Sequence, residues 1–221
     1  MVVGDSTAQV TGTGMVAWAD DHPDLAQVEV QAFGGCGILV DGDRYYRDEW
    51  LPTSPGCVGL LDETVPERIR EGQPDIVLIV SSFWDNTDHR WPDDPTARST
   101  LDRAYQERAR KRFTQYNQTL LEAGAPRIAW VLYPATDESW DAVDETSDDP
   151  ARHAAYHELE RQAATPFPGK VSTIDLAEWS DEQGLTDDHA ARPDGVHWAP
   201  DVSKRVIDEW LGNQVIQAAL H

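Results

Sequence analysis

The chain has 221 residues and a formal net charge of −22 at pH 7, from 40 acidic residues against 18 lysines and arginines. This length suffices for one domain with a complete hydrophobic core. The strong negative charge argues against binding to nucleic acid or anionic lipid, and the lack of any run of about 18 apolar residues argues against a membrane-spanning helix.

The N-terminal segment Val2–Thr7 has the pattern of a short buried strand, a sharp glycine turn and a helix start. Ser6 stands at the carboxyl end of this strand. The backbone N–H groups of the helix start and the positive end of the helix dipole suit an oxyanion that develops beside Ser6. Ser6 is therefore a candidate nucleophile. The alternative is that Ser6 only caps the helix, because serine is a common cap residue.

Apolar periodicity predicts the remaining elements in chain order. The helix that starts at Ser6 is expected to run to about Asp20. Further strands are expected at 25–33, 75–80, 127–133 and 171–176, and further helices at 66–70, 96–123, 151–164 and 199–220. The segments 39–55 and 134–150 are expected to be loops. This order predicts a three-layer α/β/α fold with a parallel sheet of about five strands, of the flavodoxin-like kind.

Near the other end of the chain, Asp194 precedes His197 by three residues, on a turn before the last helix. This spacing lets the carboxylate accept from one imidazole nitrogen while the other nitrogen faces a nucleophile. Sites in parallel sheets lie beyond the carboxyl ends of the strands, where Ser6 and this turn are both expected. Ser6, His197 and Asp194 thus form a candidate catalytic triad.

Two other groups of residues have less specific patterns. His153 and His157 are spaced four apart on a predicted helix, but no His-Glu-x-x-His motif accompanies them, so we predict an ordinary surface pair and no metal site. The basic stretch 103–112 is predicted to be a solvated helix face with pairs such as Glu107–Lys111, and docking on an acidic partner domain is the alternative. No Walker loop or Rossmann glycine fingerprint occurs, and no cofactor is predicted.

The Gly4–Ser6 block on the first strand and the Asp194–His197 turn together resemble the SGNH (GDSL-type) hydrolase family. Within that family, Gly35-Cys36 after the second strand and Trp84-Asp85 after the third are most similar to the SGNH domains fused to bacterial membrane acyltransferases. The resemblance covers nearly the whole chain. It implies a single SGNH-hydrolase-like domain over residues 1–221, which could be cut from a longer membrane-attached protein.

The resemblance also implies an oxyanion hole made by the backbone N–H groups of Ser6 and of a glycine after the second strand. Gly35 is the best match for that glycine, with Gly34 as the second choice and a plain glycine turn as the alternative. The family's usual asparagine donor is missing, because Trp84 stands at its position. Asn86 from a shifted loop or the Trp84 indole could replace it; otherwise the backbone donors remain alone.

Tryptophan faces stack on the apolar faces of sugars, so the tryptophans that follow strand ends or adjoin His197 could line a carbohydrate site or could simply pack the loops. They are Trp84, Trp91, Trp140 and Trp198. From this set and the resemblance, we predict Trp84, Asp85 and Trp198 as substrate-binding residues.

The two cysteines, Cys36 and Cys57, are too few for a zinc site of their own. They could form a disulfide that closes a loop of about 20 residues and contributes roughly 3 kcal/mol, or remain reduced in a cytosolic protein. The resemblance favours the disulfide, since the fused domains are extracytoplasmic and often pair cysteines here. It therefore implies an extracytoplasmic location.

Together, residues and resemblance predict a serine-dependent esterase or acyltransferase. The resemblance implies small acyl groups such as acetyl, carried by a cell-envelope carbohydrate, and a membrane acyltransferase domain as a further partner. The alternative is a catalytically weak or inactive module that binds a glycan or positions an acceptor, and the replacement at Trp84 motivates it.

Overall fold

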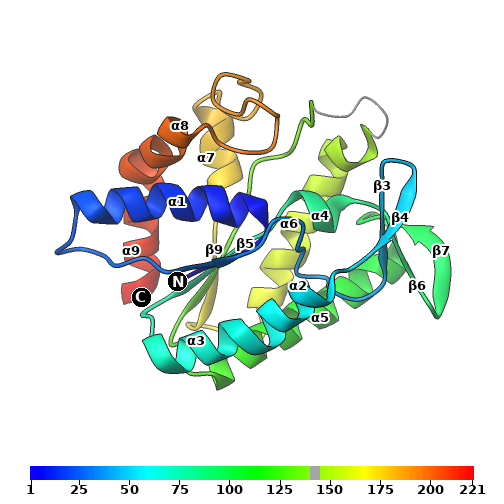
Figure 1. Ribbon diagram of the computed structural model, residues 1–221, viewed down its shortest axis with the longest axis horizontal. Helices are drawn as coiled ribbons and strands as arrows, with labels where there is room; N and C mark the ends of the chain where they lie inside the picture. The colour runs from blue at the N-terminus through cyan, green and yellow to red at the C-terminus, as the bar shows by residue number, and fades with distance from the viewer. Residues whose placement is uncertain (140–144) are drawn as a thin grey trace.

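Five parallel strands form the central sheet of the computed structural model, which describes residues 1–139 and 145–221. In spatial order they are β2 (Val30–Ala32), β1 (Val2–Gly4), β5 (Val77–Val80), β8 (Ile128–Val131) and β9 (Val171–Ile174). With helices on both faces of this sheet, the predicted three-layer fold class is confirmed (Figure 1).

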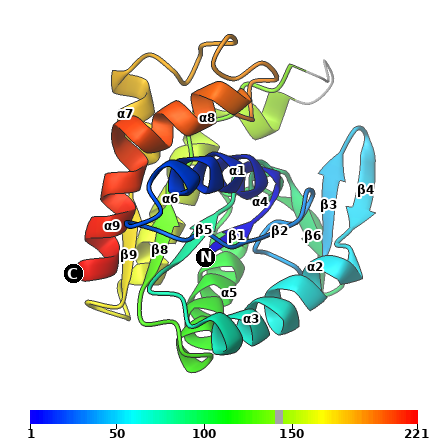
Figure 2. The same ribbon diagram turned by 60° about the vertical axis from the view of Figure 1, so that its left-hand side comes forward.

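The two helical layers are seen in Figures 1 and 2. One layer contains α1 (Ser6–Asp21), α7 (Leu176–Glu182), α8 (Pro200–Val206) and α9 (Gly212–Leu220), with a π-helical turn, η3 (Ile207–Leu211), between the last two. The other contains α2 (Pro55–Gly59), the π-helical turn η1 (Leu60–Thr64), α3 (Val65–Gly72), α5 (Arg103–Glu122) and α6 (Pro150–Ala164). A short 3-10 helix, η2 (Glu145–Asp148), precedes α6. Within the described residues, no helix is both long enough and apolar enough to cross a membrane.

Alternating side chains of the strands build a separate core under each layer. Val3, Val77 and Ile79 pack into the core beneath α3, α5 and α6. Their neighbours Val2 and Leu78 pack into the core beneath α1, α8 and α9. Continuous apolar runs supply both cores at once, which is what a parallel sheet covered on both faces requires.

A second sheet lies to one side of the first and is not predicted from the sequence (Figure 1). This small sheet is antiparallel, in the order β4 (Glu49–Pro52), β3 (Asp43–Tyr46), β6 (His89–Trp91) and β7 (Asp94–Arg98). The prediction of a loop over 39–55 was therefore wrong in part. The predicted start of the long helix at residue 96 was also wrong, because β7 occupies that segment and α5 begins at Arg103.

Candidate active site

Ser6 lies where β1, an inner strand of the parallel sheet, meets α1. Gly4 has φ 145°, and a Cβ on it would lie 1.8 Å from the carbonyl oxygen of Val80, so the turn requires glycine. Asp5 caps α1, since its carboxylate accepts hydrogen bonds from the backbone N–H (2.8 Å) and hydroxyl (2.6 Å) of Thr7. This corner presents Ser6 at the helix N-terminus, where backbone N–H groups lack intrahelical partners.

The turn that carries His197 lies against this corner. Nε2 of His197 is 2.7 Å from Oγ of Ser6, and Nδ1 is 2.7 Å from Oδ2 of Asp194. The other carboxylate oxygen accepts from the backbone N–H groups of Val196 (2.9 Å) and His197 (2.7 Å). The structure thus brings together the three residues of the predicted triad. In this geometry His197 can take a proton from Ser6 while Asp194 fixes the imidazole tautomer.

Asp194 is held ready as a hydrogen-bond acceptor. Partial burial would raise the pKa of its carboxyl, but the hydrogen bonds from the backbone and ring of His197 and from the Val196 N–H outweigh burial and hold that pKa below its ordinary value. The carboxylate form that the relay needs is therefore favoured in the folded protein.

Buried side chains hold the turn that carries His197. Arg192 is fully buried, and its guanidinium donates to the carbonyl oxygens of Ala135 (2.6 Å) and Val196 (3.3 Å). The Tyr133 hydroxyl donates to the same Val196 carbonyl at 3.1 Å. Trp198 is 2 % exposed, with its ring centroid 6.0 Å from that of Tyr133. Trp198 therefore packs beneath the triad and, contrary to its predicted role, presents no face to a substrate.

The loop that follows β2, residues 33–39, is called the glycine loop and lies next to the nucleophile. A Cβ on Gly34 would lie 3.8 Å from the Cβ of Ser6, and Gly35 has φ 84°, a conformation that favours glycine. In the described part of the chain, the N–H groups of Gly34 and Gly35 donate to no other group. Both remain candidates for the backbone donor expected of Gly35.

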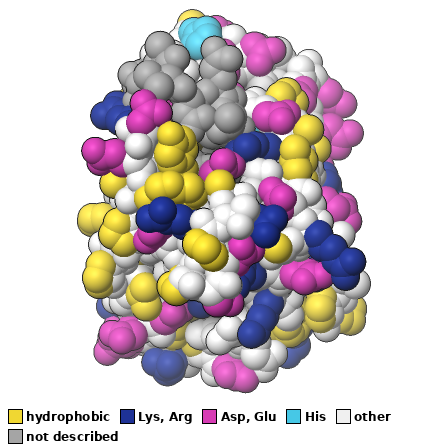
Figure 3. Space-filling view, turned by 90° about the vertical axis from the view of Figure 1, so that its right-hand side faces the viewer, with side chains coloured by type: hydrophobic (Ala, Val, Ile, Leu, Met, Phe, Trp, Pro, Cys, Tyr) yellow, Lys and Arg dark blue, Asp and Glu magenta, His cyan; other side chains and the backbone are white. Residues whose placement is uncertain are grey.

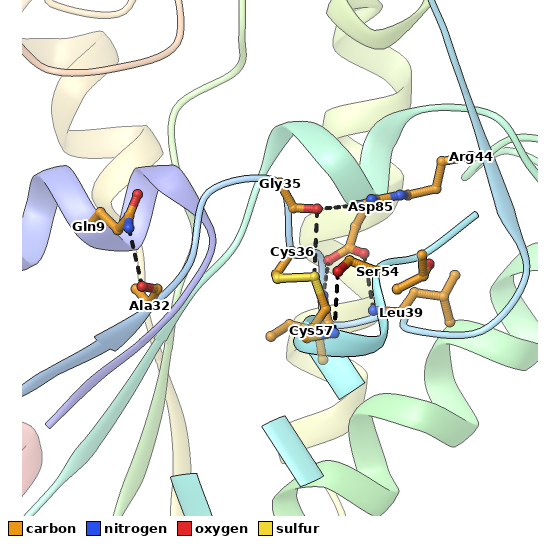
Figure 4. Close-up of a disulfide and its surroundings, with 12 residues drawn as sticks. Gln9, Ala32, Gly35, Cys36, Leu39, Arg44, Ser54, Cys57 and Asp85 are labelled. Carbon is orange, nitrogen blue, oxygen red and sulfur yellow. Dashed lines mark hydrogen bonds between the residues drawn. A yellow bond between two sulfur atoms is a disulfide. The ribbon is translucent and has the colours of Figure 1, made fainter. Parts of the chain in front are cut away.

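Asp85 anchors this loop rather than facing a substrate. It is fully buried, and Oδ2 accepts from the Ile38 N–H and the Ser81 hydroxyl, both at 2.8 Å. Oδ1 accepts from the Leu39 N–H at 3.1 Å (Figure 4). A Cβ on Gly37 would lie 2.1 Å from Oδ1, so the loop approaches the carboxylate as closely as glycine allows. The predicted substrate contact of Asp85 is thus replaced by a structural one.

The predicted disulfide between Cys36 and Cys57 is confirmed, with a Cα–Cα distance of 5.3 Å. Both half-cystines are buried. The bond joins the glycine loop to α2, beside the Asp85 anchor (Figure 4). The loop next to Ser6 is therefore tied to the layer that contains α5.

The block after β5 forms a short helix, α4 (Phe83–Asn86), on which Trp84 and Asn86 have different surroundings. Asn86 is fully buried, and its amide nitrogen donates to the Ser82 carbonyl at 3.0 Å. This placement does not support the suggested oxyanion role of Asn86. Trp84 is half-buried, with its ring centroid 5.1 Å from that of Tyr46 and 4.7 Å from Cζ of Arg44. The indole ring thus packs against the small sheet.

The remaining candidates lie apart from the triad. Trp91 is buried in the core, and Trp140 lies outside the described residues. The prediction of a surface histidine pair was wrong. His153 is buried, with Nε2 2.9 Å from the Ser147 carbonyl, and His157 is half-buried, with Nε2 2.9 Å from the Tyr133 carbonyl. Across the described residues, no group of three or more side chains could hold a metal ion.

The face that carries the small sheet mixes basic, acidic and apolar side chains (Figure 3). On α5, Glu107 pairs with Arg103 at 2.7 Å, in place of the predicted partner Lys111. Other basic residues of the helix form ion pairs with residues outside it, such as Arg112 with Asp62 at 2.8 Å.

No protein-family model matches the chain, and no curated protein sequence matches it. Solved structures do resemble it. An acetyl xylan esterase matches with TM-score 0.56 and 16% identity, over 96% of this chain and 98% of that one. A carbohydrate acetylesterase family member from Sinorhizobium meliloti matches with TM-score 0.57 and 13% identity, over 100% and 99%. A gut microbial diltiazem-metabolizing enzyme matches with TM-score 0.50 and 12% identity, over 97% of this chain and 46% of that one. At these identities the likeness is one of fold, and the chain has the fold of these enzymes.

Proposed function

We propose that this protein is an SGNH-type hydrolase that cleaves small acyl esters, acetyl esters above all, carried by carbohydrates. The observation that carries the proposal is the relay from Ser6 through His197 to Asp194, with 2.7 Å at both links. Ser6 stands at a helix N-terminus, beyond the carboxyl ends of the strands, which is where parallel α/β folds form their sites.

In the proposed reaction, Oγ of Ser6 attacks the ester carbonyl while Nε2 of His197 takes the hydroxyl proton. The tetrahedral intermediate then expels the sugar alcohol, which takes that proton from His197. Water attacks the acyl-Ser6 while His197 takes its proton, and the intermediate collapses to release the carboxylic acid as His197 returns that proton to Oγ of Ser6. Asp194 stabilises the imidazolium in both halves of the cycle. Attack by a sugar hydroxyl instead of water would make the same site an acyltransferase.

The N–H groups of Ser6 and Gly35 stabilise the oxyanion in this proposal. Trp84 stands at the position of the family's asparagine, and the Asn86 amide is turned inward, so neither adds a side-chain amide to these donors. Removal of one such donor lowers kcat about 100- to 1,000-fold in other hydrolases. We therefore expect slow turnover. The same feature supports the second candidate, a glycan-binding module that retains the triad residues without efficient catalysis.

The substrate class rests on the fold neighbours whose whole length the chain covers, an acetyl xylan esterase and a carbohydrate acetylesterase family member. The disulfide supports a location outside the cytosol, where such bonds persist. Acetylated envelope glycans are the substrates that would be met there.

Acetate release from acetylated xylan tests the proposal, with p-nitrophenyl butyrate as a longer ester and Ser6→Ala as the inactive variant. We expect acetate from the wild type, a preference for the acetyl ester, and no turnover by Ser6→Ala. A folded wild type that releases no acetate but binds the glycan as well as Ser6→Ala does would contradict the hydrolase and favour the binding module.

A further inference from the structure

Arg44 of the small sheet is buried beside the glycine loop. It lies on β3, only 5 % of the residue is exposed, and Nη1 donates to the Gly35 carbonyl at 2.6 Å (Figure 4). Its Cζ lies 4.7 Å from the centre of the Trp84 ring, within the range of a cation–π contact. Arg44 therefore joins the loop next to Ser6 to the block after β5.

The environment of Arg44 is unusual for a buried cation. In the described part of the chain, no carboxylate forms an ion pair with it, and its Nε is buried with no hydrogen-bond partner. Burial lowers the pKa of the guanidinium, and the negative charges of Asp85 and Asp5 offset this effect only in part. A buried cation without a paired carboxylate is costly, so packing alone is a poor explanation for it.

Arg44 contacts the glycine loop at Gly35, just before the residues that the disulfide and Asp85 hold. The next residue, Cys36, is fixed by the disulfide, and its N–H donates to the Phe33 carbonyl at 3.2 Å. Ile38 and Leu39 are fixed by Asp85. Gly34 and Gly35 lie upstream of these ties. The Gly35–Cys36 peptide is held on both sides, because its N–H donates to the Phe33 carbonyl and its carbonyl accepts from the Arg44 guanidinium.

We propose that Arg44 is a positioning residue, which holds the Gly35 carbonyl so that the Gly34–Gly35 backbone is set as oxyanion donor beside Ser6. This inference rests on the proposed ester hydrolysis. In it, Trp84 provides the face on which the guanidinium lies. The small sheet, which is built around β3, thereby becomes part of the catalytic scaffold through one side chain.

The test compares Arg44→Ala and Arg44→Lys with Arg90→Ala. Arg90 is a matched control, because it lies in the same sheet, with Cζ 4.6 Å from the Trp50 ring, but bonds Asp43 rather than the glycine loop. With p-nitrophenyl acetate we expect Arg44→Ala to lower kcat about 10- to 100-fold at little change in KM, since a misplaced oxyanion donor acts on the transition state. Arg44→Lys should recover part of this loss, and methylguanidinium in the assay should restore Arg44→Ala but not Arg90→Ala.

Hydrogen exchange of the peptide that spans 33–39 gives a reading that does not depend on turnover. Arg44→Ala should raise exchange there and Arg90→Ala should not. Equal exchange in both variants, or an active wild type whose kcat survives Arg44→Ala within about twofold, would overturn the positioning role. If Arg44→Ala does not fold, Arg44→Lys carries the same comparison. A wild type without esterase activity would instead refute the proposed function, and the exchange result would still decide whether Arg44 holds the loop.

Discussion

Replacement of Asp85 should destabilise the protein by an amount that depends on how many of its hydrogen bonds the new side chain keeps. Its two carboxylate oxygens accept from the N–H groups of Ile38 and Leu39 and from the hydroxyls of Ser81 and Tyr156, at 2.8–3.1 Å. Asp85→Ala leaves all four donors buried without a partner. At about 1–3 kcal/mol for each stranded donor, we expect a loss of about 4 kcal/mol or more in the free energy of unfolding.

Asp85→Asn should cost less, because the amide can keep its oxygen toward the three donors on Oδ2. Its nitrogen then faces the Leu39 N–H, so one donor is stranded and we expect a loss of about 1–3 kcal/mol. Asp62→Asn is the control. It removes the charge of Asp62, whose side chain is 37% exposed in its pair with Arg112, and should change stability by about 1 kcal/mol or less.

Urea unfolding followed by fluorescence measures all three variants, with ester turnover as the second reading. Both Asp85 variants should also lose activity, Asp85→Asn less than Asp85→Ala, because the glycine loop loses one of its two N–H bonds to this side chain in Asp85→Asn and both in Asp85→Ala. Equal losses of stability in Asp85→Ala and Asp85→Asn, or an Asp85→Ala variant within about 1 kcal/mol of wild type, would refute the account of the loop.

Two further predictions concern buried Glu160 and the disulfide. Glu160 is fully buried, neither of its carboxylate oxygens has a hydrogen-bond partner in the described part of the chain, and burial raises the pKa of its carboxyl well above 4.5. The folded state holds this proton more tightly than the unfolded state, so Glu160 should lower wild-type stability progressively as pH rises above about 4.5, and urea unfolding of Glu160→Gln from about pH 5 to about pH 8 should lack that decrease. The Cys36→Ala/Cys57→Ala variant opens a loop with a sequence separation of 21, so its unfolding free energy should fall by about 3 kcal/mol. Addition of a reductant to the unfolding assay should weaken the wild type toward this variant and leave the variant unchanged.

The parallel sheet and the meeting of Ser6 with His197 are predictable because their signals are local. A run such as 77–80 has the length and β-branched content of a buried strand, and the sheet topology follows from the alternation of strands and helices. The Asp194-to-His197 spacing fits on a single turn. The two ends of the site, 191 residues apart, then meet because parallel strands align their carboxyl ends.

The small sheet is not predictable in the same way. The hairpin between β3 and β4 turns through Arg47 and Asp48, with φ 52° and 61°, where a turn of this kind usually has asparagine or glycine. The β7 segment 94–98 contains a proline and an aspartate, so its sequence lacks the β-branched pattern of a strand. Its pairing with β6 is set by the tertiary structure. Arg44, which lies in this sheet, is missed for the same reason.

Burial of polar side chains accounts for the remaining differences. The two loop N–H groups that Asp85 accepts from lie 47 and 46 residues away in the sequence, and the Tyr156 hydroxyl lies 71 away. Nothing in the neighbourhood of Trp84-Asp85 distinguishes such an anchor from a substrate contact. The one local clue is Gly37, whose missing Cβ makes room for the carboxylate, and it is understood only once both residues are in place.

The central claim is that Ser6 is a nucleophile activated by His197. A fluorophosphonate probe followed by peptide mass spectrometry tests it most directly, with Ser6→Ala, His197→Ala and, as a control, Ala at the exposed serine of β9, Ser172→Ala. The account predicts a probe adduct on Ser6 in wild type and Ser172→Ala, and its loss in both triad variants. Absence of labelling in the folded wild type, or labelling that persists in Ser6→Ala, would contradict it.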